Sequence, residues 1–148
     1  MSKNPIEIPD LGLFEPYFLE SGELFYYFRK IEFKNSFPKL VVYPDDVGPS
    51  KMKNRQELKE RFLRFTEKID IAMSAFPGLL RKECREYRIS ESQISDKQLV
   101  ADLDWTNINL DPGGTIECYA TNLAVSNNFD ISFGFTNQIV LYRLQFDG

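Results

Sequence analysis

The sequence predicts one α+β domain over residues 1–148, with strands and helices in the order βββ-αα-ββββ. Three observations support this. Strand-like apolar alternation fills the first 45 residues and the last 50, a helical apolar period fills the middle, and 148 residues suit one domain. We therefore expect an antiparallel sheet with a helical hairpin packed on one of its faces.

Three strand-like segments come first. Residues 12–19 surround Pro16, which favours an edge strand. Residues 24–33 are rich in aromatic and β-branched side chains, and residues 37–43 form a third strand. In the second segment, alternation places four side chains on one face: Phe25, Tyr27, Ile31 and Phe33. Residues 44–53, with two prolines and a glycine, are predicted to be a loop.

The middle of the chain carries one apolar stripe at helical spacing. Its members are Leu58, Phe62, Phe65, Ile69, Met73 and Phe76. Asn54, with Glu57 three residues later, resembles a capping box, so a helix is predicted over residues 54–75. Pro77 should end that helix and begin a second, shorter one.

The last third is predicted to be strands. Leu99 to Trp105 alternates with Asp102 and Asp104, and the apolar phase then slips near Thr106, as a β-bulge would cause. Residues 111–114 (DPGG) predict a tight turn. Strands are predicted over residues 115–121, 129–136 and 138–146, the last with Val140, Tyr142, Leu144 and Phe146 inward.

Composition excludes several kinds of chemistry. The chain has no histidine and two cysteines, which removes Ser-His-Asp triads, Cys-His dyads and zinc sites with histidine ligands. The acidic run after Asp102 lacks the glycine of a calcium loop, so we expect no metal, no cofactor and no catalytic residues. The formal charge of −4 argues against nucleic acid as a partner.

Localisation is expected to be cytoplasmic. No apolar run has the length of a membrane helix, so no membrane association is predicted, and the first residues lack the pattern of a signal peptide. Cys84 and Cys118 continue the apolar phases of their segments, which predicts reduced thiols packed in the core.

Charge is distributed unevenly along the chain. Residues 51–88 contain eleven basic and six acidic side chains, whereas residues 99–148 contain one basic and six acidic side chains. The segment 24–28 (LFYYF) has large side chains on both faces of its strand, so one face needs a cover, which is either another layer of the domain or a binding partner.

Candidate partner-binding residues follow from these two features. We expect acidic side chains to steer a basic partner and aromatic side chains to anchor it. The steering candidates are Asp102, Asp104, Glu117 and Asp130, and the anchor candidates are Tyr26, Trp105 and Tyr119. Asp102 and Asp104 also permit two other interpretations, a solvated strand face or the carboxylate pair of a hydrolase.

The last 65 residues resemble small bacterial immunity-type domains of polymorphic or contact-dependent toxin systems. The resemblance lies in a helical segment ending at Tyr87, the segment 99–103, the turn 112–114 leading into residues 115–119, and the closing strands 129–135 and 139–148. It implies a small acidic protein without catalytic residues, which binds one cognate toxin and occludes its active or substrate-binding surface.

Two functions are therefore predicted. The first is a non-enzymatic protein-binding module, an immunity protein whose partner is a basic toxin domain and which is a monomer or weak homodimer. The alternative is a small-molecule-binding or regulatory domain with an aromatic pocket lined by Tyr26, Phe28 or Trp105.

Overall fold

The computed structural model describes residues 4–91, 93–122 and 125–147, apart from the side chains of residues 49 and 126–129. Four strands precede the helices: β1 (Ile6–Ile8), β2 (Gly12–Phe18), β3 (Leu24–Lys30) and β4 (Lys39–Val42). The helical part comprises α1 (Pro44–Val47), the 3₁₀ turns η1 (Pro49–Lys51) and η2 (Met73–Ala75), α2 (Met52–Ala72), α3 (Phe76–Glu86) and α4 (Asp96–Ala101). Four more strands follow: β5 (Leu103–Leu110), β6 (Ile116–Asn122), β7 (Ser126–Phe135) and β8 (Leu141–Asp147).

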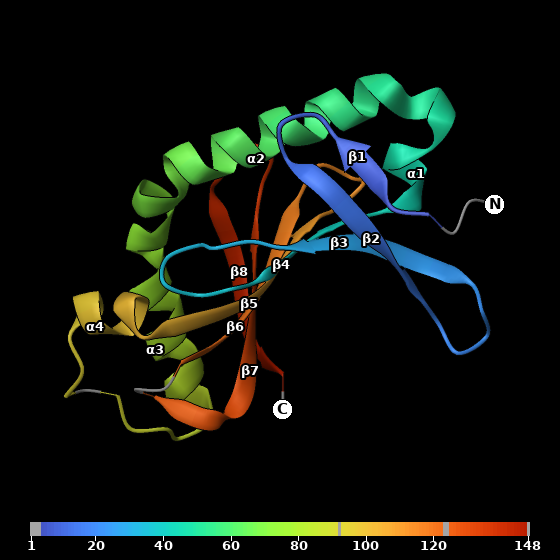
Figure 1. The fold of residues 1–148 in the computed structure, drawn as a ribbon. Helices are drawn as coiled ribbons and strands as arrows, with labels where there is room; N and C mark the ends of the chain where they lie inside the picture. The colour runs from blue at the N-terminus through green and yellow to red at the C-terminus, as the bar shows by residue number, and fades with distance from the viewer. Residues whose placement is uncertain (1–3, 92, 123–124, 148) are drawn as a thin grey trace.

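All eight strands form one open, twisted sheet in the order of the chain (Figure 1). Neighbouring strands are antiparallel except β4 and β5, which are parallel because the helices connect them as a crossover. The predicted α+β class and mostly antiparallel sheet are confirmed. The predicted order is incomplete, because β1 adds a fourth strand before the helices.

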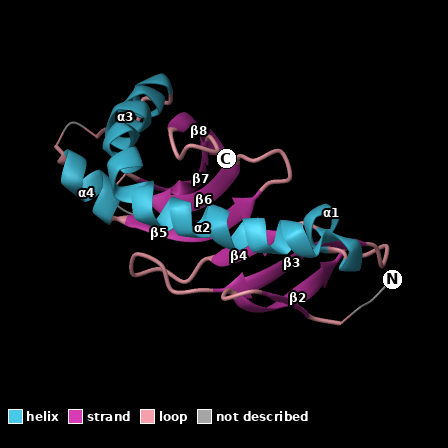
Figure 2. Cartoon of the chain, turned by 90° about the horizontal axis from the view of Figure 1, so that it is seen from above, coloured by secondary structure: helices cyan, strands magenta, loops and turns pink. Residues whose placement is uncertain are grey.

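The helices cover one face of the sheet (Figure 2). The predicted stripe explains this, since Leu58, Phe65 and Ile69 are the buried residues of α2. The helix begins at Met52 without a side-chain cap, so the predicted start at Asn54 is two residues late. Pro77 lies in the first turn of α3, as expected, but α3 turns away from the line of α2 rather than folding back as a hairpin (Figure 2).

Aromatic rings fill the space between helices and sheet. The Phe65 ring lies 5.7 Å from Phe33 and 5.5 Å from Phe135, and the Trp105 ring lies 5.1 Å from both Phe33 and Phe133, measured between centroids. These contacts join α2 to both halves of the sheet. The predicted packing of Cys84 and Cys118 in the core is confirmed, because both thiols are fully buried.

Part of the segment predicted to be a loop is helical. Residues 44–47 form α1, with Pro44 in its first turn and with Asp45 and Asp46 beside the backbone N–H groups. Proline and acidic residues both favour the start of a helix. The prolines that predicted a loop are therefore compatible with a short helix.

Leu99 and Asp102 do not belong to a strand. Residues 96–101 form α4, and Asp102 is its C-terminal cap, where it accepts a hydrogen bond from the Gln98 side chain. The Ser95 hydroxyl accepts a hydrogen bond from the Gln98 backbone N–H at 3.1 Å. Ser95 and Gln98 have the spacing of a capping box, which outweighs the alternating pattern that predicted a strand.

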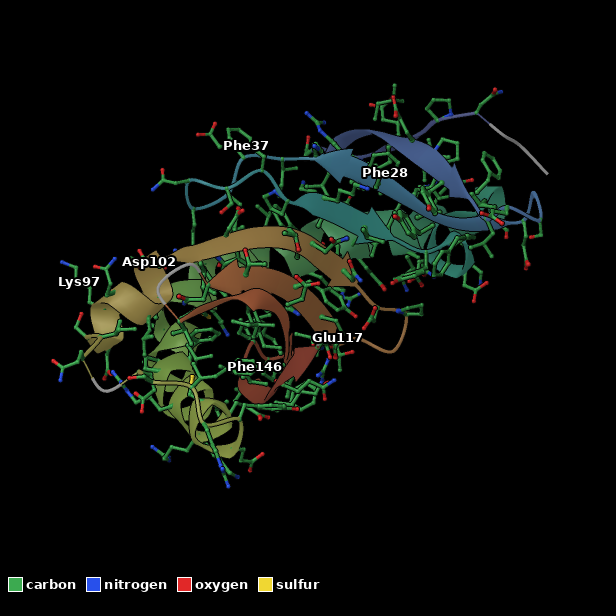
Figure 3. The ribbon with its side chains drawn as sticks, turned by 90° about the horizontal axis from the view of Figure 1, so that it is seen from below. Phe28, Phe37, Lys97, Asp102, Glu117 and Phe146 are labelled. Atoms are coloured by element: carbon green, nitrogen blue, oxygen red, sulfur yellow. The ribbon has the colours of Figure 1, made fainter. Side chains whose placement is uncertain are left out.

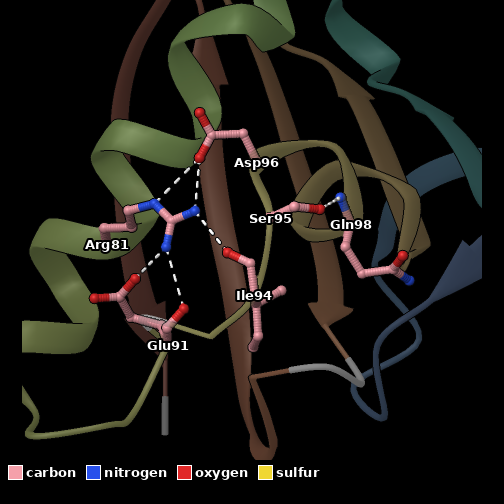
Figure 4. A network of polar contacts seen from close by, with 6 residues as sticks. All are labelled: Arg81, Glu91, Ile94, Ser95, Asp96 and Gln98. Carbon is pink, nitrogen blue, oxygen red and sulfur yellow. Dashed lines mark hydrogen bonds and ion pairs between the residues drawn. The ribbon is translucent and has the colours of Figure 1, made fainter.

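Arg81 holds the segment before α4 against α3 (Figure 4). Its guanidinium forms ion pairs with Glu91 and Asp96 and donates to the Ile94 carbonyl oxygen at 2.8 Å. One side chain thus binds Glu91, Ile94 and the first residue of α4, Asp96. Such a cluster has a structural role, since each charge already has a partner.

Bulges explain why some side chains point the opposite way from their prediction. Phe25 is the extra residue where the β2–β3 register shifts, and it is 47% exposed. Val140 and Tyr142 are exposed instead of inward, because the β7–β8 register shifts after Gly134. The predicted bulge near Thr106 is confirmed. The predicted alternation at Phe129 lies outside the described side chains.

Candidate functional site

The side of the sheet opposite the helices forms a second surface (Figure 3). Along each strand, side chains that belong to the core alternate with side chains that point to this other side. Strand register then places five side chains of neighbouring strands on it: Tyr26, Val41, Asn109, Tyr119 and Ser132. We call this surface the helix-free face.

Aromatic side chains occupy the β2–β4 half of the helix-free face. Tyr17 and Tyr26 lie opposite each other on β2 and β3, and their rings stack with centroids 4.7 Å apart and planes 7° apart. Phe28 packs edge-on against Tyr26 at 6.2 Å, and the Lys39 ammonium lies 5.0 Å from the centre of the Phe28 ring. Val41, which lies opposite Phe28, is only 1% exposed although no helix covers this face.

Tyr43 extends this cluster toward the second half of the sheet. Burial, together with the nearby Asp111 carboxylate and the Tyr119 and Tyr26 hydroxyls, raises the pKa of Tyr43 to about 12. Burial, with Glu117 nearby, also raises the pKa of Tyr119. Tyrosines from four separate segments of the chain therefore lie near one another on this face of the sheet.

A charged cluster follows these tyrosines on β6, β7 and β8. Glu117 forms an ion pair with Arg143 and accepts a hydrogen bond from the Tyr142 hydroxyl at 2.8 Å. Gly134 lies between them on β7, and a Cβ atom there would lie 2.9 Å from a Glu117 carboxylate oxygen. The absence of a side chain at Gly134 thus provides the space through which Glu117 reaches β8.

Five of the seven predicted binding residues lie on the helix-free face. Asp104, near the start of β5, lies opposite Thr121 on β6. Asp130 on β7 lies opposite Asp147, the last residue of β8. Both carboxylates are exposed and have no hydrogen bond or ion pair among the contacts of the described residues. The other three predicted residues on this face are Glu117, Tyr26 and Tyr119.

The remaining two predicted residues do not belong to this surface. Trp105 is 2% exposed and points into the core, so it is a packing residue and not an accessible anchor. Asp102 lies at the end of α4, and Figure 3 shows it at the opposite end of β5 and β6 from Glu117. Asp102 and Asp104 therefore do not form a carboxylate pair on one strand face. Glu117, unlike these two residues, lies on the helix-free face, but its carboxylate already forms an ion pair with Arg143.

Sequence reasoning missed Tyr17, Lys39 and Tyr43. A usable signal existed for Tyr43 and Lys39, because they alternate with Leu40 and Val42, which are buried in the core. The placement of Tyr17 on this face depends on the β2–β3 register, and that register contains a bulge. The apolar residues of β2 and β3 do not reveal this bulge, unlike the phase slip that predicted the bulge near Thr106.

Other kinds of site receive less support. Among residues 4–91, 93–122 and 125–147, no three His, Cys, Asp or Glu side chains are grouped to hold a metal ion. Phe28, one of the residues predicted to line the aromatic pocket of the alternative function, borders a cavity of about 310 Å³. Its walls also include Leu13 and Glu15, which alternate with the core residue Phe14, so this cavity lies on the β2–β3 part of the helix-free face.

None of the helices in the described part of the chain combines the length and apolar character needed to cross a bilayer. Comparison of the chain with protein-family models, with curated proteins and with solved structures gave no match.

Proposed function

We propose that this protein is a non-enzymatic binding module that takes a basic protein partner onto its helix-free face. The observation that carries the proposal is that Tyr17, Tyr26, Tyr43 and Tyr119 lie on this one face, where Tyr17 stacks on Tyr26 and Tyr43 lies near both Tyr26 and Tyr119. Tyrosine offers a rigid ring with large apolar area and a polar hydroxyl, and it is enriched at protein interfaces for this reason.

The charges around these tyrosines favour a partner rich in lysine and arginine. Asp104 and Asp130 are exposed carboxylates on the same face, and they attract cationic groups over distances of about 10 Å. Arginine and lysine side chains also bind over tyrosine rings, as Lys39 already does near Tyr17 at 6.0 Å. Steering charges and aromatic anchors thus act on the same partner.

The finer proposal is that the partner is a bacterial toxin domain and that the protein is its immunity protein in the cytoplasm. The resemblance of the last 65 residues to immunity-type domains supports this, as does the acidic helix-free face. In this role the sheet would cover the active or substrate-binding surface of the toxin, and the helices would face away from it. The resulting complex would be stoichiometric.

The experiment measures the affinity of the chain for the product of the open reading frame next to its own gene, with single alanine substitutions. Tyr26→Ala and Tyr119→Ala should each weaken binding by about 1–2 kcal/mol or more, as truncation of an aromatic anchor does. Leu63→Ala is the matched control, because Leu63 is 45% exposed on the helix side. Equal affinities for all three variants would contradict the proposed surface.

A growth assay tests the finer proposal. Expression of the neighbouring product alone should arrest growth, and coexpression of this protein should restore it. Restoration should fail with a Tyr26→Ala/Tyr119→Ala double variant that is still folded. Binding without any effect on growth would leave the binding face in place but contradict the immunity role.

A further inference from the structure

An apolar cavity of about 390 Å³ lies beside the C-terminal end of α2, away from the helix-free face. One wall is formed by α2 and η2, and the other by the β7–β8 turn and the first residue of β8. The apolar side chains on these walls are Ile71, Ala72, Ala75, Ile139, Val140 and Leu141. Cavities that hold small molecules typically have volumes of about 300–1,000 Å³ and mostly apolar walls.

Two side chains of this cavity expose much apolar surface to water. Ile71 is 79% exposed, the largest value for a large hydrophobic side chain in the described part of the chain, and Val140 is 57% exposed. The two residues come from different elements and border the same cavity. An alkyl chain lying between them would remove this surface from water, and its affinity would grow with each added methylene group.

The β7–β8 turn presents Val140 at a cost in backbone strain. Ile139 has φ +60°, a conformation that is unfavourable for a β-branched residue. The Thr136 hydroxyl accepts hydrogen bonds from the backbone N–H groups of Gln138 at 3.2 Å and Val140 at 3.3 Å. The Ile139 N–H donates to the Thr136 carbonyl oxygen at 2.9 Å, so the turn is held in this form. Strained residues of this kind are concentrated at functional sites, including ligand-binding sites.

The charge of the cavity indicates which kind of apolar ligand it takes. Lys68 is the one charged side chain among the wall residues, and its ammonium group has no ion pair or hydrogen bond among the contacts of the described residues. Lys68 precedes Ile71 and Ala72 by three and four residues, which places all three on one side of α2. A molecule whose alkyl chain lies along Ile71 can therefore bring a negative group to Lys68.

We propose that this cavity binds the anion of a medium-chain fatty acid. The carboxylate accepts hydrogen bonds from the Lys68 ammonium group, and the alkyl chain lies between Ile71 and Val140. A cationic amphiphile is repelled by Lys68, and a neutral one lacks the charged contact. This site is independent of the proposed partner-binding face, and its test needs no protein partner.

The experiment measures by calorimetry the affinity of the whole chain for hexanoate, octanoate and decanoate, each below the concentration at which it forms micelles. Affinity should rise about fivefold or more with each two added methylene groups, because each one buries more apolar surface. Decanol and decylamine are the matched probes, and both should bind more weakly than decanoate. The proposal is overturned by no binding of decanoate, by affinity that is independent of chain length, or by binding of decylamine as tight as that of decanoate.

Substitution of Lys68 tests the assigned charged contact. Lys68→Gln should weaken decanoate binding about threefold or more and leave decanol binding unchanged, because only the carboxylate gains from the ammonium group. Lys53→Gln is the control, because Lys53 is an exposed lysine of α2 that is not part of the cavity wall. Equal affinity of the two variants for decanoate would contradict the contact.

Substitution of Ile71 tests the apolar contact. Ile71→Ser should weaken the binding of decanoate and of decanol alike, and the exposure of Ile71 means that folding does not depend on this side chain. Leu63→Ser is the matched control, because Leu63 is an exposed apolar residue of α2 outside the cavity wall. Equal decanoate affinities for these two variants would show that the ligand does not lie in this cavity.

Discussion

Glu117 and Arg143 form an ion pair that passes over β7 at Gly134, so that three neighbouring strands are joined by one contact. The pair depends on a residue that takes no part in it, because any side chain at Gly134 would occupy the same space. Tyr142 completes the arrangement, and its hydrogen bond to Glu117 raises the pKa of the Tyr142 hydroxyl.

Gly134→Ala should therefore destabilise the protein. The new methyl group would contact the Glu117 carboxylate and the Tyr142 ring at about 3 Å, and overpacking of this kind costs about 1–3 kcal/mol. Urea denaturation measures the change in unfolding free energy. Gly113→Ala is the control, because nothing lies within 4 Å of its added methyl group. Equal stability of the two variants would show that Gly134 is not required for the cluster.

Phe65 should be among the most costly side chains to truncate. Its ring is fully buried and contacts Phe33, Phe62 and Phe135, so Phe65→Ala leaves a cavity and should cost about 3–5 kcal/mol. Leu63→Ala on the exposed side of α2 should change the unfolding free energy by less than about 0.5 kcal/mol. A small effect at Phe65 would contradict the described packing of α2 on the sheet.

Features that depend on residues close in sequence could be predicted, whereas features that depend on the pairing of distant segments could not. The apolar stripe of α2 depends on local spacing and is visible in the sequence, as are the bulge near Thr106 and the burial of Cys84 and Cys118. The helix at residues 96–101 was missed because the alternation from Leu99 to Leu103 concealed the Ser95–Gln98 cap.

The candidate site depends more strongly on distant pairing. Aromatic character alone suggested Trp105 as an anchor, whereas its alternation with Asp104 already places the two side chains on opposite faces, with Trp105 in the core and Asp104 exposed. Asp46 and Arg61 border one cavity only because α1 and α2 both lie beside the β5–β6 turn. No local pattern in the sequence contains that information.

Tyr43 should make the protein sensitive to alkaline pH. Its pKa is about 12 in the folded state and about 10 when unfolded, so the folded state binds this proton more tightly. The corresponding stability is complete below pH 10 and is lost as the pH rises toward 12. Because Tyr43 is partly exposed, we expect a loss of about 1 kcal/mol rather than the full linkage value.

Absorbance of tyrosinate near 295 nm, recorded with urea denaturation from pH 9 to 12, measures this effect. Tyr43→Phe should remove the component that titrates near pH 12 and flatten the fall in stability. Tyr17→Phe is the control on the same face, because its loss should leave that component unchanged. A wild-type protein with equal stability at pH 9.5 and 11.5 would contradict the assigned environment of Tyr43.

Both cysteines should be unreactive in the folded protein. Cys84 and Cys118 are fully buried, and burial raises the pKa of the Cys84 thiol to about 11 and that of Cys118 well above its usual range. Because the thiolate is the reactive form, Ellman's reagent should label no thiol in the native state and two in denaturant. Rapid labelling under native conditions would show that the core opens at one of them.

The central claim is that a basic partner binds the helix-free face, and association kinetics at low and high salt test it most directly. Asp104→Lys combined with Asp130→Lys should lower the association rate about tenfold or more at low salt, with a smaller effect at high salt. Glu60→Lys combined with Glu67→Lys makes the same charge change on exposed positions of α2 and should have a much smaller effect. Equal rates for the two double variants would contradict the claim.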